Sequence, residues 1–181
     1  SVIALENGWN GTSNVSVVLN GTFSDNMIGG TMAHSWVMSF EDEDEAFIAW
    51  DRIFPGTTML IDTYDVEKAA KSIRRMAEAG EISFPNDVRI DSDPLEDYCI
   101  AVNKIFEGTS TKVINFISGD MDCEKFEHFE TMNVPYGKAM AGTKYCYNSM
   151  IVEKLNAGFV YKIVEFITKD GVTIRSEKKA T

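Results

Sequence analysis

The stretch "TTMLIDTYDVEKAAKSIRRMAEAG", residues 57–80, decides the fold class of this chain. Residues 57–64 contain a continuous apolar run, which is typical of a strand buried in a sheet. Residues 65–80 predict a helix, with Asp65 as its N-cap and Gly80 just past its end. A strand followed at once by a helix is the repeating unit of α/β proteins.

The same order of strand and helix recurs on both sides of this unit. Downstream, strands are predicted within 87–93 and 111–120, and helices within 94–108 and 123–133. The remaining expected elements are a helix at 13–19, an apolar segment at 26–33, a helix at 35–54, a short strand at 137–143 and an antiparallel hairpin at 158–179.

Repeated strand–helix units imply parallel strands joined by right-handed crossovers, in either a TIM-like barrel or an open doubly wound sheet. A complete barrel needs about 250 residues. This chain of 181 residues supplies about five βα units, so an open sheet and part of a barrel both remain possible. The fold expected here is α/β, a partial TIM-like barrel with a C-terminal β-hairpin, in one domain over 1–181.

Composition narrows the class of protein. The net charge of −11 argues against nucleic acid binding, which depends on Lys and Arg neutralising phosphates. No apolar run approaches the length of about 18 residues that suggests a membrane span, and the first residues do not resemble a signal peptide. The three cysteines are widely spaced and odd in number, which favours a reducing, cytoplasmic compartment.

Polar residues gather where the predicted strands end. The residues at these positions are His34; Asp62 and Asp65; Arg89, Asp91 and Asp93; Ser118, Gly119, Asp120 and Asp122; Gly142 and Thr143. In parallel α/β folds the βα loops converge at this rim, where ligands bind.

The charged residues that follow the strands divide into two groups. Asp65, Asp93 and Asp122 are expected to be helix caps. Asp62, Arg89, Asp91 and Asp120 instead lie at or near the strand ends, where a charge must be paired or bound to a ligand.

Such a rim suits a sugar phosphate bound with a divalent cation. Carboxylates accept hydrogen bonds from ribose hydroxyls and hold Mg²⁺, directly or through water. The Gly142–Thr143 turn can cradle a phosphate if it opens a helix. A bound Mg²⁺ would also mediate between an acidic protein and an anionic ligand.

Seven motifs stand out along the chain: "GTSNV" (11–15), "GTMAHSWVMSFEDEDEAFIAW" (30–50), "IDTYD" (61–65), "VRIDS" (88–92), "SGDMD" (118–122), "GTK" (142–144) and "VYKIVE" (160–165). In this order and spacing they resemble nicotinate phosphoribosyltransferases over nearly the whole chain. The related nicotinamide phosphoribosyltransferases have a different sequence around the histidine and match less well.

The resemblance implies a function in NAD biosynthesis. Enzymes of this family, which are ligases or glycosyltransferases by class, join nicotinate to phosphoribosyl pyrophosphate and couple the reaction to ATP hydrolysis. They have an incomplete α/β barrel preceded by an N-terminal domain, and their active sites form across a homodimer. This chain would then be a cytoplasmic barrel fragment that lacks the N-terminal domain.

The resemblance also implies roles for individual residues. His34, in "GTMAHS", would be the residue that ATP phosphorylates to phosphohistidine, and Asp62 would orient it. Arg89 would meet the nicotinate ring and the ribosyl phosphate. Asp91 and Asp120 would meet ribose hydroxyls and the Mg²⁺-bound pyrophosphate.

The remaining implied contacts concern the 5′-phosphate. Gly119, Gly142 and Thr143 would donate to it, and Lys144 stands where the family usually has arginine. His128 lies on a helix face and is expected to be structural.

Two local departures from the family keep other functions open. The family's Asp-Ser-Gly-Asp is here "DSDP", and Met140 replaces a glycine of its phosphate turn. They favour a non-catalytic barrel remnant that binds a phosphate or a partner subunit. A third reading, a phosphate-binding barrel enzyme without an ATP step such as quinolinate phosphoribosyltransferase, is disfavoured by "GTMAHS".

Overall fold

The computed structural model describes residues 10–12, 28–142, 165–167 and 170–175. The chain divides into two compact units, residues 1–31 and 32–181. In the first unit, Thr12 and Ile28 form an isolated parallel bridge, and the Gly29 amide donates to the Thr12 carbonyl at 3.0 Å. The predicted helix at 13–19 lies outside the described residues.

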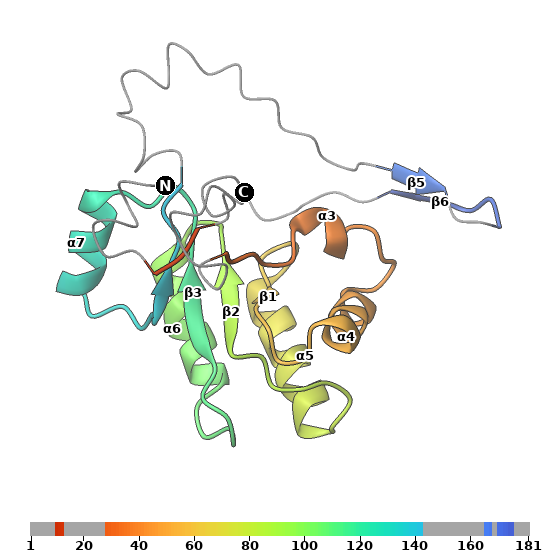
Figure 1. Cartoon of the computed structure of the whole chain (residues 1–181), viewed down its shortest axis with the longest axis horizontal. Coiled ribbons are helices and arrows are strands. Elements are labelled where there is room, and N and C mark those ends of the chain that lie inside the picture. Colours follow the sequence, from red (N-terminus) through yellow and green to blue (C-terminus); the bar gives the residue numbers. More distant parts are fainter. Residues whose placement is uncertain (1–9, 13–27, 143–164, 168–169, 176–181) are drawn as a thin grey trace, which may run out of the picture. The chain divides into compact units, whose positions relative to one another are not determined.

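A four-stranded parallel sheet forms the centre of the second unit (Figure 1). Its strands lie in chain order: β1 (Met59–Leu60), β2 (Asp87–Ile90), β3 (Ile114–Ile117) and β4 (Lys138–Ala139). Because each strand pairs in parallel with the next one along the chain, the carboxyl ends of all four strands lie at the same end of the sheet. The α/β class is confirmed. The sheet of the described residues is open, and the predicted TIM-like barrel is not confirmed.

Three helices follow the first three strands: α5 (Val66–Glu78), α6 (Leu95–Ile105) and α7 (Cys123–Thr131). α5 and α6 pack side by side, and α6 also packs on β2 and β3 (Figure 1). The buried residues of α5 recur at helical spacing and form one apolar stripe. They are Val66, Ala69, Ala70, Ile73, Met76 and Ala77.

The helix predicted over 35–54 is two helices, so that prediction was wrong. α3 (His34–Val37) is a single turn, and α4 (Glu43–Ile53) begins after a break. The break is at Asp42, which has an extended backbone and is the N-cap of α4. Its side chain accepts a hydrogen bond from the Asp44 amide at 3.0 Å. The indole of Trp36 donates to the Ala46 carbonyl at 3.0 Å and ties the two helices together.

Two of the three predicted caps are confirmed. Asp65 accepts from the Lys68 amide at 2.8 Å, and Asp122 accepts from the Lys125 amide at 2.9 Å. Asp93 is not a cap, because Pro94 occupies the N-cap position of α6. The Asp93 carboxylate instead lies 3.5 Å from the Lys125 ammonium.

A buried charge lies at the opposite end of the sheet from the predicted rim. Asp87, at the start of β2, is 1% exposed and accepts from the Thr58 hydroxyl and from the Lys138 ammonium. Lys138 belongs to β4, so its side chain reaches past β3 to make this ion pair. The pair therefore connects the edge strand to the second strand.

The predicted C-terminal hairpin is confirmed by β5 (Glu165–Ile167) and β6 (Thr173–Arg175), which pair antiparallel. Among the described residues, no helix has the length and apolar character needed to cross a membrane.

The two kinds of aspartate give a matched test of capping. We expect Asp65→Ala to lower the free energy of unfolding by about 1 kcal/mol, because α5 loses its side-chain cap. Asp93→Ala removes only an exposed ion pair and should change stability by less than about 0.5 kcal/mol. Urea unfolding measures both, and equal losses would contradict the assignment.

Candidate functional site

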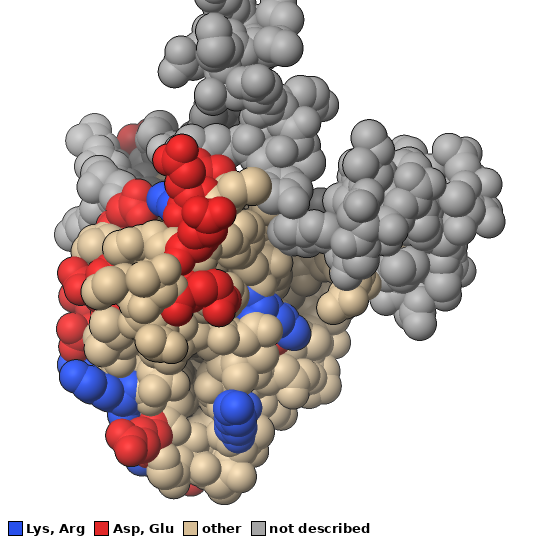
Figure 2. All heavy atoms as spheres, turned by 90° about the vertical axis from the view of Figure 1, so that its left-hand side faces the viewer, with Lys and Arg blue, Asp and Glu red and all other residues tan. Residues whose placement is uncertain are grey.

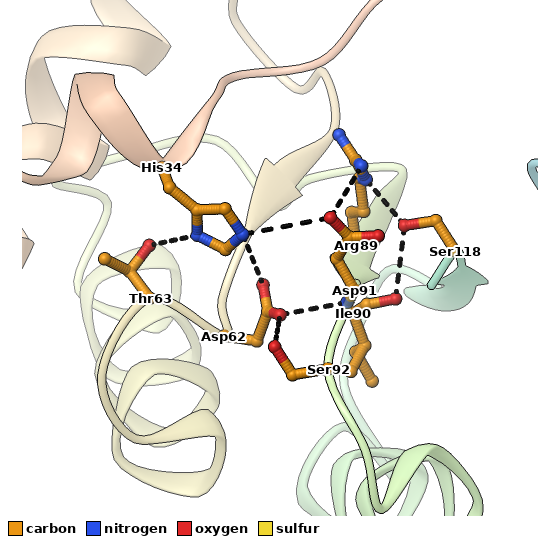
Figure 3. Close-up of polar contacts among 8 residues, drawn as sticks. All are labelled: His34, Asp62, Thr63, Arg89, Ile90, Asp91, Ser92 and Ser118. Carbon is orange, nitrogen blue, oxygen red and sulfur yellow. Dashed lines mark hydrogen bonds and ion pairs between the residues drawn. The ribbon is translucent and has the colours of Figure 1, made fainter. Parts of the chain in front are cut away.

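His34 is the first residue of α3, and its imidazole turns toward the ends of β1 and β2 (Figure 3). Its Nδ1 atom lies 3.1 Å from the Thr63 hydroxyl. Its Nε2 atom lies 3.9 Å from Asp62 Oδ1 and 3.9 Å from Asp91 Oδ2. The ring is therefore held from one side by a hydroxyl and faces two carboxylates on the other.

Asp62 joins the ends of the first two strands. It lies just after β1 and is fully buried. Its Oδ2 atom accepts from the Asp91 amide at 3.0 Å and from the Ser92 hydroxyl at 2.5 Å (Figure 3). This carboxylate therefore fixes the backbone of the loop that follows β2.

Arg89 extends the network to the third strand. Its Nε–H donates to the Ser118 hydroxyl at 2.8 Å, and its guanidinium lies 3.1 Å from Asp91 Oδ2. Ser118 immediately follows β3 and is buried. The four predicted residues His34, Asp62, Arg89 and Asp91 thus lie in one network at the strand ends (Figure 3).

The Asp91 carboxyl is the centre of charge in this network. Burial alone would raise its pKa, but contact with the His34 ring, the charge of Arg89 and the Ser118 hydroxyl stabilise the ionised form. Together they hold the pKa of Asp91 at about 2. Asp91 is therefore a carboxylate at neutral pH.

Two buried polar atoms of the site have no hydrogen-bond partner: His34 Nε2 and Asp62 Oδ1. They face each other at 3.9 Å, which is too long for a hydrogen bond. Unsatisfied buried polar atoms are rare because they cost free energy, and they occur at functional sites. The space beside Nε2 is therefore a place where a bound group could give both atoms a partner.

The other predicted residues lie along the rim without joining this network. Gly119 has a φ of +95°, and a Cβ placed there would lie 3.0 Å from the Asp91 carbonyl oxygen, so the β3 and β2 loops touch at this point. Asp120 is exposed, with a φ of +52°. Gly142 is also exposed. Thr143 and Lys144 lie outside the described residues.

Three residues of the network were given no role from the sequence: Thr63 and Ser92, and Ser118, which was predicted only to lie at the rim. Each is a hydroxyl residue beside a predicted charge or at a strand end, in "DTYD", "RIDS" and "ISGD". That adjacency is the signal that could have found them, since a buried charge needs hydrogen-bonding neighbours.

The predicted Mg²⁺ ligands, Asp91 and Asp120, do not form a metal centre with a third ligand. Over the part of the chain that the structure describes, no cluster of three or more His, Cys, Asp or Glu residues is arranged to hold a metal ion. Asp91 is already paired with Arg89. The described residues therefore do not fit a metal held by protein ligands alone.

Acidic side chains gather on the surface near the site. Figure 2 shows the side of the molecule where α7 lies, with the acidic side chains in red clustered at the top of the described surface. The exposed acidic residues of α7, of the first turn of α6 and of the two rim loops are Asp93, Asp97, Asp120, Glu124, Glu127 and Glu130. The cations that the structure describes at this rim are Arg89 and Lys125, whose ammonium donates to the Gly119 carbonyl at 3.1 Å.

Comparison with known proteins finds partial similarity to one class of enzyme. The chain is 39% identical over 69 residues to nicotinate phosphoribosyltransferase pncB2 from two strains of Mycobacterium tuberculosis. It is 29% identical over 181 residues to nicotinate phosphoribosyltransferase of Bacillus subtilis. No family model matches the chain, and no solved structure does.

These relatives are much longer than the chain. The mycobacterial match covers 38% of the chain and 15% of that protein. The Bacillus match covers 97% of the chain and 35% of that protein. The similarity supports a relationship to nicotinate phosphoribosyltransferases. Because the match covers only part of those proteins, their activity can only be proposed for this chain.

The low pKa of Asp91 predicts a loss of stability in acid. Its ordinary pKa of 3.8 lies above the folded value of about 2, so the ionised group stabilises the fold above about pH 4. That contribution, at most about 2 kcal/mol, is lost as the pH falls toward 2.

Urea unfolding at about pH 7 and about pH 3 should show the loss in the wild-type chain and a smaller one in Asp91→Asn. Asp93→Asn, at an exposed carboxylate, is the control and should behave like wild type. An equal pH dependence in Asp91→Asn and wild type would contradict the assignment.

Proposed function

We propose that this chain carries the catalytic rim of a nicotinate phosphoribosyltransferase-type enzyme of NAD biosynthesis. The observation that supports this most is the meeting of His34, Asp62, Arg89 and Asp91 at the ends of adjacent parallel strands. The partial similarity to enzymes of that name supports the same choice. The substrates proposed are nicotinate, phosphoribosyl pyrophosphate and ATP.

In the ATP-dependent step, the His34 ring accepts the γ-phosphoryl group. Imidazole suits this role because its neutral form is nucleophilic near pH 7. The nitrogen that takes the group is Nε2, since it is unpartnered, whereas Nδ1 is engaged by Thr63. Asp62 holds the loop after β2 in place and faces this nitrogen.

In the transfer step, the pyrophosphate leaves C1′ of the ribose and positive charge develops on the sugar. The ionised Asp91 carboxylate stabilises that charge and accepts hydrogen bonds from ribose hydroxyls. Arg89 is held in place by Ser118 and Asp91, and its guanidinium is the cation of this network that would meet an anionic group of the substrate.

The 5′-phosphate would lie against the loops after β3 and β4. Gly119 would donate its backbone N–H to the phosphate, while Gly142, Thr143 and Lys144 would supply further donors. Asp120 extends the rim toward ribose hydroxyls. Mg²⁺ is proposed only as the companion of the substrate's phosphates, with Asp91 and Asp120 reaching it through water.

A second function, binding without turnover, is favoured by the acidic rim and the scattered phosphate donors. Asp120 and Gly142 are both exposed and make no part of the network around His34. On this view the chain binds a phosphate or a partner subunit and transfers nothing. If the chain belongs to an active enzyme, that enzyme is proposed to be a cytoplasmic homodimer.

Phosphorylation tests the first function directly. We expect the chain, incubated with γ-labelled ATP and Mg²⁺, to take up an acid-labile label, and His34→Ala to remove it, because the acceptor nitrogen is gone. His128→Ala is the matched control, since His128 is exposed and pairs with Glu96 at 2.7 Å. Absence of label from the unaltered chain would contradict this function.

Calorimetry with phosphoribosyl pyrophosphate and Mg²⁺ separates the two functions. If the chain is part of an enzyme, we expect it to bind phosphoribosyl pyrophosphate with a dissociation constant of roughly micromolar order. Arg89→Ala should increase that constant at least about tenfold. Arg75→Ala, at an exposed arginine paired with Asp44, should bind as the wild type does. Binding without labelling of His34 would favour the second function, and no binding would count against the enzyme.

A further inference from the structure

We propose that Lys125 is a further binding residue of the rim, whose ammonium binds a phosphate group of the ligand at the turn after β3. The position of the ammonium follows from its contacts in the structure. The choice of a phosphorylated sugar as the ligand rests on the proposed function above.

Lys125 is the third residue of α7, and its side chain reaches the loops at the strand ends. Its ammonium donates to the Gly119 carbonyl at 3.1 Å and lies 3.5 Å from Asp93 Oδ1. Gly119 belongs to the loop after β3, and Asp93 belongs to the loop after β2. The ammonium therefore lies between the two loops that carry most of the rim.

The turn that Lys125 contacts is packed against the network around His34. A Cβ placed on Gly119 would lie 3.0 Å from the carbonyl oxygen of Asp91, which is the carboxylate that faces His34 Nε2. The ammonium on the other side of this turn is therefore close to the site and belongs to the same rim.

The stability of α7 does not account for a lysine at this position. The N-terminus of a helix carries partial positive charge, so a cation in the first turn is unfavourable there. The features that favour this end of α7 are the Asp122 cap and the acidic Glu124. The contacts that explain Lys125 are those it makes with the loops.

The contacts of Lys125 leave its charge available to a ligand. An ammonium has three N–H donors. Within the described residues its partners are one neutral carbonyl and one carboxylate, and the separation of 3.5 Å from that carboxylate is long for a charge-assisted hydrogen bond. The Asp93 side chain is 70% exposed, so this ion pair contributes little free energy.

An anionic ligand needs such a cation at this rim. The exposed side chains around it are mostly acidic, and the other cation described there, Arg89, lies 3.1 Å from the Asp91 carboxylate. An ammonium is a compact point charge that suits a phosphate group. On binding, the phosphate would replace Asp93 as the anionic partner of Lys125, beside the backbone N–H of Gly119.

Calorimetry with phosphoribosyl pyrophosphate, and separately with ribose 5-phosphate, tests the role of the ammonium. We expect Lys125→Gln to raise both dissociation constants about tenfold, because a charged donor to the phosphate is lost. Lys71→Gln is the matched control, since Lys71 is exposed on α5 and pairs with Glu67, and it should bind as the wild type does.

A double-mutant cycle with Asp93 separates ligand binding from a purely structural link between the loops. If Lys125 binds the phosphate, Asp93→Asn removes a competitor and should lower the dissociation constant about threefold. Glu124→Gln removes an equal charge from a neighbouring position and should have a smaller effect. In the Lys125→Gln background, Asp93→Asn should have no more effect than Glu124→Gln.

Two outcomes would overturn the proposal: unchanged dissociation constants in Lys125→Gln, or weaker binding in Asp93→Asn, as expected if the ion pair only holds the loops together. Failure of the proposed function looks different, because His34 would then take up no label while Lys125→Gln still weakened binding. A wild-type chain that binds neither ligand would overturn both. If Lys125→Gln does not fold, the comparison of Asp93→Asn with Glu124→Gln decides.

Discussion

The Asp62 carboxylate is the constraint on which the rest of the site depends. It is fully buried just after β1, and one of its oxygens accepts from the backbone and the side chain of the loop after β2. Removing that acceptor would take one hydrogen bond each from the Asp91 amide and the Ser92 hydroxyl. Because the same loop carries Asp91, which pairs with Arg89, the position of every charge near His34 depends on this one carboxylate.

The repeated strand–helix pattern predicted the class of fold and the edge at which the site lies. Residues 57–80 behave as expected because an apolar strand, the cap Asp65 and Gly80 all favour the same local structure. Once the strands are parallel, Asp62, Arg89 and Asp91 fall at the same end of the sheet from chain order alone. His34 begins α3 before the first strand of the sheet, and its contacts bring it to the same place. Sequence reasoning therefore located these four residues together without knowledge of distances.

The errors arose where two local signals competed or where contacts are distant along the chain. Residues 35–54 have helical spacing throughout, but Asp42 caps a new helix and divides the segment. Asp93 resembles a cap until Pro94 takes that position. The pairing of Thr63 with His34 spans 29 residues, and barrel closure depends on strands beyond a four-stranded sheet, so local patterns indicate neither.

The ion pair between Asp87 and Lys138 has a consequence for the far edge of the sheet. β4 pairs with β3 through two residues only, which by itself leaves an edge strand prone to slip in register. Lys138 anchors that strand to a buried acid two strands away. The position of the chain that leaves β4, including Gly142, is thereby fixed by an ion pair at the opposite end of the sheet from the His34 network.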